Sequence, residues 1–364
     1  MMMHLETKHR RAFQKLQEAQ SSLTSFQQSK ARIDLKRADA RLEEALNLDP
    51  NYLRAFYYRG LVRDMLGDAE QAAKDFGLVL EQQPPFVPEV RYNLGVATFH
   101  QYGHTNLALA VTHFEAVIKS TNKPALRLRA SAFLAHAYAV MMIPRPAEKT
   151  DDCGKLNEFL ASEAARKHVS KFHTLSVERS AALESELKSG QDVDSSTRDE
   201  ISWRLRNTLA VQRMFYTDYF ETDRIAKLRK AEQVLLEADA INPSNWSIYC
   251  NLGSTYMRLA HWLGMQEGRV TEEAEAYFEK ALARLDKVMA DLILDYSFAI
   301  YEKGRVYRLW GKFDEAKTWL QRALEVKENQ TVSVTTITCE LERAKLGRTD
   351  YPFLRADPSE SLSR

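Results

Sequence analysis

The segment that decides the fold is LRAFYYRGLVRDMLGDAEQAAKDFGLVLEQQP (residues 53–84), which follows ADARLEEALNLDPN (38–51). Four positions of the first segment recur 34 residues later: Ala38, Leu42, Ala45 and Pro50 are matched by Ala72, Phe76, Val79 and Pro84. A fixed period of this size is typical of stacked helix pairs, because a single pair cannot bury its own apolar face. The period therefore predicts an array of helices without sheet.

Each unit carries its own stop signals. Proline cannot continue a helix, so Pro50 and Pro84 mark the ends of two units. Gly67 and Asp68 separate two stretches of helical periodicity and predict the turn within a unit. Gly60 lies inside a predicted helix, where a glycine costs about 1 kcal/mol relative to alanine. We expect the two helices of this unit to cross closely at Gly60.

The same register returns along the chain. Small and large apolar residues occupy matching positions at Leu94, Gly95, Ala110, Phe114 and Val117, at Ala231, Leu235, Ala238 and Pro243, at Trp246, Tyr249, Leu252, Gly253, Tyr256, Ala274, Phe278 and Ala281, and at Gly304, Tyr307, Gly311, Ala316, Leu320 and Ala323. Over residues 31–124 and 225–330 the pattern resembles the tetratricopeptide repeat (TPR) family. The resemblance implies an all-α fold, a TPR-type α-solenoid of antiparallel helix pairs with an irregular helical middle region.

The chain departs from this period in two places. Ala231 and Ala274 lie 43 residues apart, so we expect an extended turn over 261–271. Between 125 and 220 the pattern degrades into a polar loop, a long charged helix over 155–188, and SGQDVDSSTRD (189–199), which has no apolar anchor. We place a domain boundary at 189–199 and expect mobility there. An ordinary loop inside one continuous superhelix is the alternative.

These features divide the chain into five parts. They are an N-terminal helical arm or cap (1–30), a first TPR block (31–145), an irregular helical region and linker (146–199), a second TPR block (200–330), and a C-terminal cap helix with a disordered tail (331–364). The arm carries an apolar stripe of Phe13, Leu16, Ala19 and Leu23. This stripe predicts a helix that packs on the first repeat, or else a coiled-coil or partner-docking arm.

Composition restricts the class of partner. The chain has 51 Lys and Arg residues against 50 Asp and Glu, a net charge of +1, so it has no bulk attraction to nucleic acid or to an anionic membrane. No apolar run approaches the roughly 18–20 residues that span a bilayer, and the polar start of the chain is unlike a secretory signal. Cys153, Cys250 and Cys339 form an odd, widely spaced set, which argues against a disulfide framework. We expect a cytoplasmic protein.

Catalytic signatures are missing from the sequence. It contains no GxSxG, HExxH or GxGxxG motif. His100 and His104 are four residues apart, but no further ligand follows at a suitable spacing. We therefore predict that the protein is not an enzyme and uses no cofactor and no metal.

The resemblance also locates a binding surface. In TPR proteins the first helix of each unit lines a concave face. Carried over to this chain, that face comprises Arg54, Tyr57, Leu61, Met65, Tyr92, Val96 and His100 in the first half, and Ser247, Cys250, Ser254, Arg258, Phe298, Tyr301 and Arg305 in the second. Tyrosine and arginine suit peptide recognition because they give a large contact area together with hydrogen bonds. The alternative is that Tyr57, Tyr92 and Tyr301 only pack between neighbouring units.

The function implied by the resemblance is that of a non-catalytic protein–protein interaction scaffold or adaptor, which binds a partner peptide or domain in the concave groove. A regulatory sensor is the alternative: its groove would bind a peptide or small effector and gate a partner enzyme or transcription factor. In either case we expect the partner to be another protein or peptide, with no nucleic acid and no membrane, and the sequence leaves the oligomeric state open.

Overall fold

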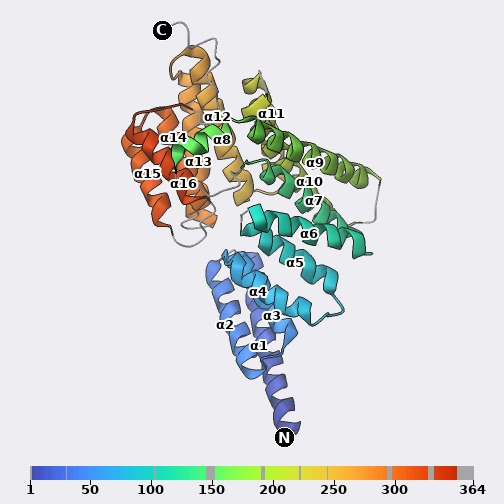
Figure 1. Cartoon of the computed structure of the whole chain (residues 1–364). Coiled ribbons are helices and arrows are strands. Elements are labelled where there is room, and N and C mark those ends of the chain that lie inside the picture. The colour runs from blue at the N-terminus through green and yellow to red at the C-terminus, as the bar shows by residue number, and fades with distance from the viewer. Residues whose placement is uncertain are drawn as a thin grey trace. The chain divides into compact units, whose positions relative to one another are not determined.

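The structure is a computed structural model that describes residues 2–29, 31–101, 104–144, 152–189, 193–220, 223–243, 245–292, 297–326 and 332–350. Within these ranges the regular structure is helical and no strand occurs, which confirms the expected all-α solenoid (Figure 1). The chain separates into two compact units, Met1–Ala130 and Ser131–Arg364. Each unit is described by itself below.

The first unit consists of consecutive helix pairs. Its helices are α1 (Met2–Ser29), α2 (Arg32–Leu48), α3 (Leu53–Leu66), α4 (Ala69–Glu81), α5 (Val87–His100), α6 (His104–Ser120) and the start of α7 (Pro124–Met141). Neighbouring helices pack in chain order, α1 on α2, α3 on α4 and α5 on α6. The arm predicted over 1–30 is α1, whose Ala12, Leu16 and Ala19 are buried in one apolar cluster with α2. Phe13, from the predicted stripe, is exposed instead.

The α3–α4 pair shows how the sequence produces a unit. Gly67 ends α3 in the left-handed region at φ 92°, a conformation that glycine adopts without strain. Asp68 then caps α4 by accepting a hydrogen bond from the Gln71 amide. A Cβ atom built on Gly60 would lie 2.8 Å from Cε1 of Phe76, because α3 and α4 cross at this point. The expected close crossing is therefore present.

The second unit continues in the same manner after the end of α7. Its helices are α8 (Cys153–Leu160), α9 (Glu163–Lys188), α10 (Ser195–Phe220), α11 (Arg224–Ile241), α12 (Trp246–Glu267), α13 (Glu272–Lys287), which runs into a π-helical turn η1 (Val288–Leu292), α14 (Ser297–Trp310), α15 (Phe313–Glu325) and α16 (Val334–Lys345). The pairs α10–α11, α12–α13 and α14–α15 pack closely, and α16 packs on α15.

The predicted single helix over 155–188 is wrong, because the structure divides it in two. α8 ends before Ala161, and α9 begins with its own cap, in which Ser162 Oγ accepts a hydrogen bond from the Ala165 amide. α9 then packs on its neighbours through buried polar groups. Ser176 Oγ donates to the Ala135 carbonyl of α7 at 2.7 Å, and Gln212 Nε2 of α10 donates to Ser176 Oγ at 2.7 Å.

The predicted extended turn over 261–271 is also wrong. The extra residues lengthen α12, which stays helical to Glu267 and ends at Gly268 with φ 66°. His261 is thereby a buried helical residue. Beyond Ala260, Trp262 and Leu263 of α12 still pack against the apolar core, which explains why the helix does not stop at 261.

Several expectations fall on residues outside the described ranges. They include most of the polar loop before α8 (145–151), the centre of the predicted linker (190–192) and the C-terminal tail (351–364). The boundary at 189–199 stays a prediction, although α9 and α10 on its two sides pack together. Among the described residues, no helix is both long enough and apolar enough to cross a membrane.

Candidate functional site

The predicted binding residues of the first unit lie on α3 and α5. Tyr57 and Leu61 are one helical turn apart on α3, and Val96 and His100 are one turn apart on α5. We call the surface formed by Tyr57, Leu61, Asp64, Met65, Asn93, Val96 and His100 the α3–α5 face. Two hydrogen bonds cross this face from α3 to α5, which shows that the first helices of these two successive helix pairs run side by side.

The first of these hydrogen bonds holds Tyr57 in place. Asn93 Nδ2 donates to the Tyr57 hydroxyl at 2.9 Å. The Tyr57 ring makes edge-on contacts with Phe76 at 5.9 Å and with Phe86 at 5.5 Å between ring centroids. Burial raises the pKa of the Tyr57 hydroxyl, and the hydrogen bond from Asn93 acts in the opposite direction. Tyr57 therefore packs between two neighbouring helix pairs, as the alternative interpretation expected, and it remains half-buried.

The second hydrogen bond joins Asp64 to His100. His100 Nδ1 lies 2.8 Å from Asp64 Oδ1, and both side chains remain partly accessible. Asp64 was not among the predicted site residues. It could have been found from its position, since it lies three residues after Leu61 and therefore on the same helical face.

The other predicted residues of the first unit differ in exposure. Arg54 is exposed and Met65 is 49% exposed, whereas Tyr92 and Val96 are half-buried. A separate open cleft of about 390 Å³ lies between α2 and α3 and is lined by Glu43, Leu46, Asn47, Pro50, Phe56 and Arg59. None of the predicted residues lines that cleft.

In the second unit the predicted binding residues are mostly buried. Arg258 is 3%, Tyr301 7% and Arg305 5% exposed, and Phe298 is half-buried. Ser254 and Cys250 are buried as well, while Ser247 is half-buried. In this conformation a partner could reach few of these side chains. Their role in binding stays a prediction, and for the buried ones it requires the covering segments to move.

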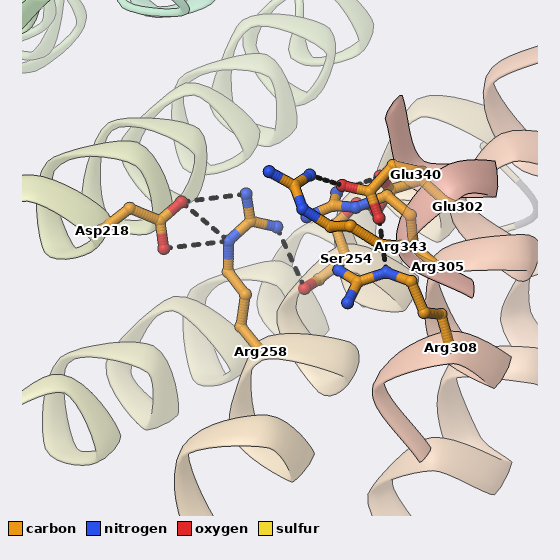
Figure 2. Close-up of polar contacts among 8 residues, drawn as sticks. All are labelled: Asp218, Ser254, Arg258, Glu302, Arg305, Arg308, Glu340 and Arg343. Carbon is orange, nitrogen blue, oxygen red and sulfur yellow. Dashed lines mark hydrogen bonds and ion pairs between the residues drawn. The ribbon is translucent and has the colours of Figure 1, made fainter. Parts of the chain in front are cut away.

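Three of the buried residues, Ser254, Arg258 and Arg305, belong to a cluster of charged and polar groups, which we call the arginine cluster (Figure 2). It contains Asp218 of α10, Ser254 and Arg258 of α12, Glu302, Arg305 and Arg308 of α14, and Glu340 and Arg343 of α16. The cluster thus draws on α10, α12, α14 and α16. Arg258 Nη2 lies 3.1 Å from Asp218 Oδ2, and Ser254 Oγ donates to Glu302 Oε2 at 2.6 Å.

The remaining contacts lie within α14 and between α14 and the segment that includes α16. Arg305 Nη1 lies 2.5 Å from Glu302 Oε1, and Arg308 Nε lies 2.6 Å from Glu340 Oε2. Arg308 also donates through Nη1 to the carbonyls of Arg348 and Asp350. These bonds matter because an ion removed from water is tolerated only where partners replace its hydration.

The cluster shifts the titration of the groups within it and beside it. Burial opposes ionisation of Glu340, but the guanidinium groups of Arg308, Arg305 and Arg343 outweigh it and lower the pKa of Glu340. Burial raises the pKa of Asp218 despite its contact with Arg258. Burial, together with the charges of Arg308 and Arg305, lowers the pKa of His261 to about 3. His261 is therefore neutral at physiological pH.

Helix α8 lies against the same part of the unit. It contacts α16, and the guanidinium of Arg343 donates a hydrogen bond to Asn157 Oδ1 of α8. Cys153, the first residue of α8, forms a disulfide with Cys339 of α16, with the two Cα atoms 5.3 Å apart.

The disulfide corrects the expectation drawn from the cysteines. Three widely spaced cysteines argued against disulfide bonding, yet two of them pair across 186 positions and Cys250 remains free and buried. The pairing depends on α8 folding back onto α16, which sequence spacing does not reveal. Among the described residues, no group of three or more His, Cys, Asp or Glu side chains is arranged to hold a metal ion.

Comparison with known proteins identifies the repeat. The sequence model of the tetratricopeptide repeat matches residues 251–329. The chain contains tetratricopeptide repeats. The matched TPR region holds Gly253 and Gly304, where a built Cβ would lie 3.0 Å from Leu285 Cγ and 2.6 Å from Leu320 Cγ. Gly60 and Gly95 make the same kind of close approach to Phe76 and Phe114 in the first unit.

Several solved structures match the chain at low sequence identity. A tetratricopeptide repeat protein from Parabacteroides merdae shares 10% identity over 91% of this chain and 99% of its own, with a TM-score of 0.46. The TPR2AB domain of yeast Sti1 in complex with pHSP90 shares 12% identity over 80% of this chain and 98% of its own (TM-score 0.29). IFIT1 with Gppp-AAAA shares 16% identity over 93% of this chain and 78% of its own (TM-score 0.42). No curated protein sequence matches the chain significantly.

Proposed function

We propose that this TPR protein is a non-catalytic interaction scaffold or adaptor that binds a peptide or domain of another protein. The observation that carries the proposal is the α3–α5 face. Its polar and aromatic side chains lie on successive first helices, they are bonded to one another across the helices, and part of each remains accessible. We place the partner site on this face, with Arg54 beside it at the start of α3.

The chemistry of the face suits an extended or helical peptide. Met65 offers exposed apolar surface, Arg54 offers a guanidinium, and Asp64 with His100 offers hydrogen-bonding groups. Tyr57 is already ordered by Asn93, so a partner would not need to immobilise its side chain. A surface ordered before binding loses less conformational entropy when the complex forms.

The test has two stages. Affinity capture with the full chain from its native host identifies a partner, and calorimetry then measures the affinity of that partner for variants. The variant Arg54→Ala/Met65→Ala removes one cation and one apolar side chain from the proposed site. The matched control Lys74→Ala/Leu78→Ala removes the same two types from exposed positions on α4, the second helix of that unit.

We expect the Arg54→Ala/Met65→Ala variant to bind about tenfold more weakly, which corresponds to about 1.4 kcal/mol, and the α4 control to bind like the parent. Both positions in each variant are exposed, so the melting temperatures should agree with that of the parent. Equal affinity of the two folded variants would exclude the α3–α5 face as the partner site.

A further inference from the structure

Helix α8 depends on its attachments for its structure. It has eight residues, and an isolated helix shorter than about 12 residues is not stable in water. Its N-terminus is capped by Asp152, whose carboxylate accepts hydrogen bonds from the amides of Gly154 and Lys155 at 2.7 and 3.2 Å. This cap lies within the segment itself, so the contacts that hold α8 in place must come from elsewhere in the unit.

Those contacts are few, and the strongest is covalent. The Cys153–Cys339 disulfide ties the start of α8 to α16. Asn157 accepts a hydrogen bond from Arg343, and Leu160 is buried at the end of α8. Cys339 and Arg343 are one helical turn apart and so lie on the same face of α16. α8 covers that face, where Cys339 and Arg343 are both buried.

α8 can leave without disturbing α9. The two helices are separated at Ala161, and Ser162 caps α9 independently. α9 is anchored to α7 by its own bonds, since His168 Nε2 lies 2.7 Å from the Met141 carbonyl oxygen and Ser176 Oγ lies 2.7 Å from that of Ala135. α8 is thus attached separately from α9, and it can be either docked on α16 or detached from it.

The surface beneath α8 favours an acidic ligand. Arg343 bonds to Glu340, which in turn bonds to Arg308 (Figure 2). The arginine cluster as a whole holds four arginines and three carboxylates, a net charge of about +1 when all are ionised. Asn157 presents only a neutral amide oxygen to Arg343, and a carboxylate in its place would accept a stronger, charge-assisted hydrogen bond.

We propose that α8 is a redox-released cover: reduction of the Cys153–Cys339 disulfide frees α8 from α16 and opens the Arg343 surface to an acidic segment of a partner protein. The reductant is a dithiol. Its thiolate attacks Sγ of Cys153, the more exposed of the two cysteine residues. The S–S bond breaks, and Cys339 leaves as a thiolate that takes up a proton. The second thiol of the reductant then displaces Cys153, so the reductant gives up two electrons and ends as a disulfide.

Hydrogen exchange tests the release in the full chain. We expect the amides of residues 156–160 to exchange at least about tenfold faster after treatment with dithiothreitol, or without it in Cys153→Ala, while the amides of α9 keep their rates. The control Cys250→Ala removes the free cysteine and should leave α8 protected in the oxidised protein. Thiol titration of the denatured protein should find one thiol before reduction and three after it.

Three thiols before reduction, or α8 amides that exchange at the same rate in both redox states, would overturn the proposal that α8 is a redox-released cover.

A second experiment tests ligand binding to the surface beneath α8. Its probe is a fluorescein-labelled peptide of residues 152–162 that carries Cys153→Ser and Asn157→Asp. Fluorescence anisotropy should show at least about tenfold tighter binding to the reduced chain than to the oxidised one, and tighter binding than the same peptide with asparagine retained. Equal or undetectable binding up to millimolar concentration would overturn the acidic-ligand assignment. The Arg54→Ala/Met65→Ala comparison, which concerns the other unit, is independent of both outcomes.

Discussion

Asn93 on α5 donates a hydrogen bond to the hydroxyl of Tyr57 on α3, 36 positions earlier, at 2.9 Å. This contact joins the first helices of two successive helix pairs, and of the two residues only Tyr57 belongs to the binding surface that the TPR resemblance predicts. Because the amide of Asn93 and the ring of Tyr57 are partly buried, the bond both orders the α3–α5 face and contributes to the interface between repeats.

Tyr57→Phe should lower the free energy of unfolding by about 1 kcal/mol, because it removes the hydroxyl and leaves the Asn93 amide without its acceptor. Tyr58→Phe is the matched control, since among the described residues the Tyr58 hydroxyl makes no hydrogen bond in the structure. Urea unfolding at neutral pH measures both. A loss equal to that of the control would mean that the Tyr57–Asn93 bond contributes nothing net.

Gly60→Ala should destabilise the protein by about 1–3 kcal/mol, although alanine is the better helix former. Its Cβ would lie 2.8 Å from the Phe76 ring, and Phe76 is only 1% exposed. Gly77→Ala, on α4 of the same pair, meets nothing within 4 Å. It should stabilise the protein by up to about 1 kcal/mol through the gain in helix propensity. A melting temperature that rises for Gly60→Ala as well as for Gly77→Ala would contradict the close crossing.

Asp218→Asn should cost about 3–5 kcal/mol, because it leaves the Arg258 guanidinium buried without its carboxylate. The double variant Asp218→Leu/Arg258→Met removes both charges and should recover most of that loss. Chemical denaturation of Asp218→Leu, Arg258→Met and the double variant gives the coupling between the two side chains. If the losses of the two single variants sum to the loss of the double variant, the two residues do not act as a pair.

His261 should make the protein lose stability as the pH falls. Its pKa is lowered to about 3 in the folded state, against an ordinary value of about 6.5. Between these values the unfolded chain binds a proton that the folded protein does not, so the free energy of unfolding drops by up to about 1.4 kcal/mol per pH unit. Asp218, with a raised pKa, acts in the opposite direction.

A comparison of the parent with His261→Gln isolates the histidine from these other groups. Urea unfolding at pH 7, 6 and 5 should show a steeper loss for the parent than for the variant below pH 6.5. Parallel pH profiles would show that His261 can take up a proton without cost in the folded protein.

Much of the helical architecture could be read from the residues alone. The 34-residue spacing identified the helix pairs, and Gly60 predicted the close crossing of α3 and α4, because both features depend on residues near one another in the chain. Predictions failed where local pattern competed with the core. The extra residues after Ala231 suggested a long turn, but the apolar residues of α12 continue into the core and keep the helix intact.

Burial of the candidate binding surfaces, in contrast, was decided only by tertiary packing. The TPR resemblance predicted equivalent faces for Tyr57 and Tyr301, yet Tyr57 remains half-exposed while Tyr301 is enclosed. Spacing along a helix reports which side chains share a face; it carries no information about what covers that face. Helix α8 covers one face of α16, and the disulfide that joins them links cysteines 186 positions apart. Such a contact forms only when the chain has folded.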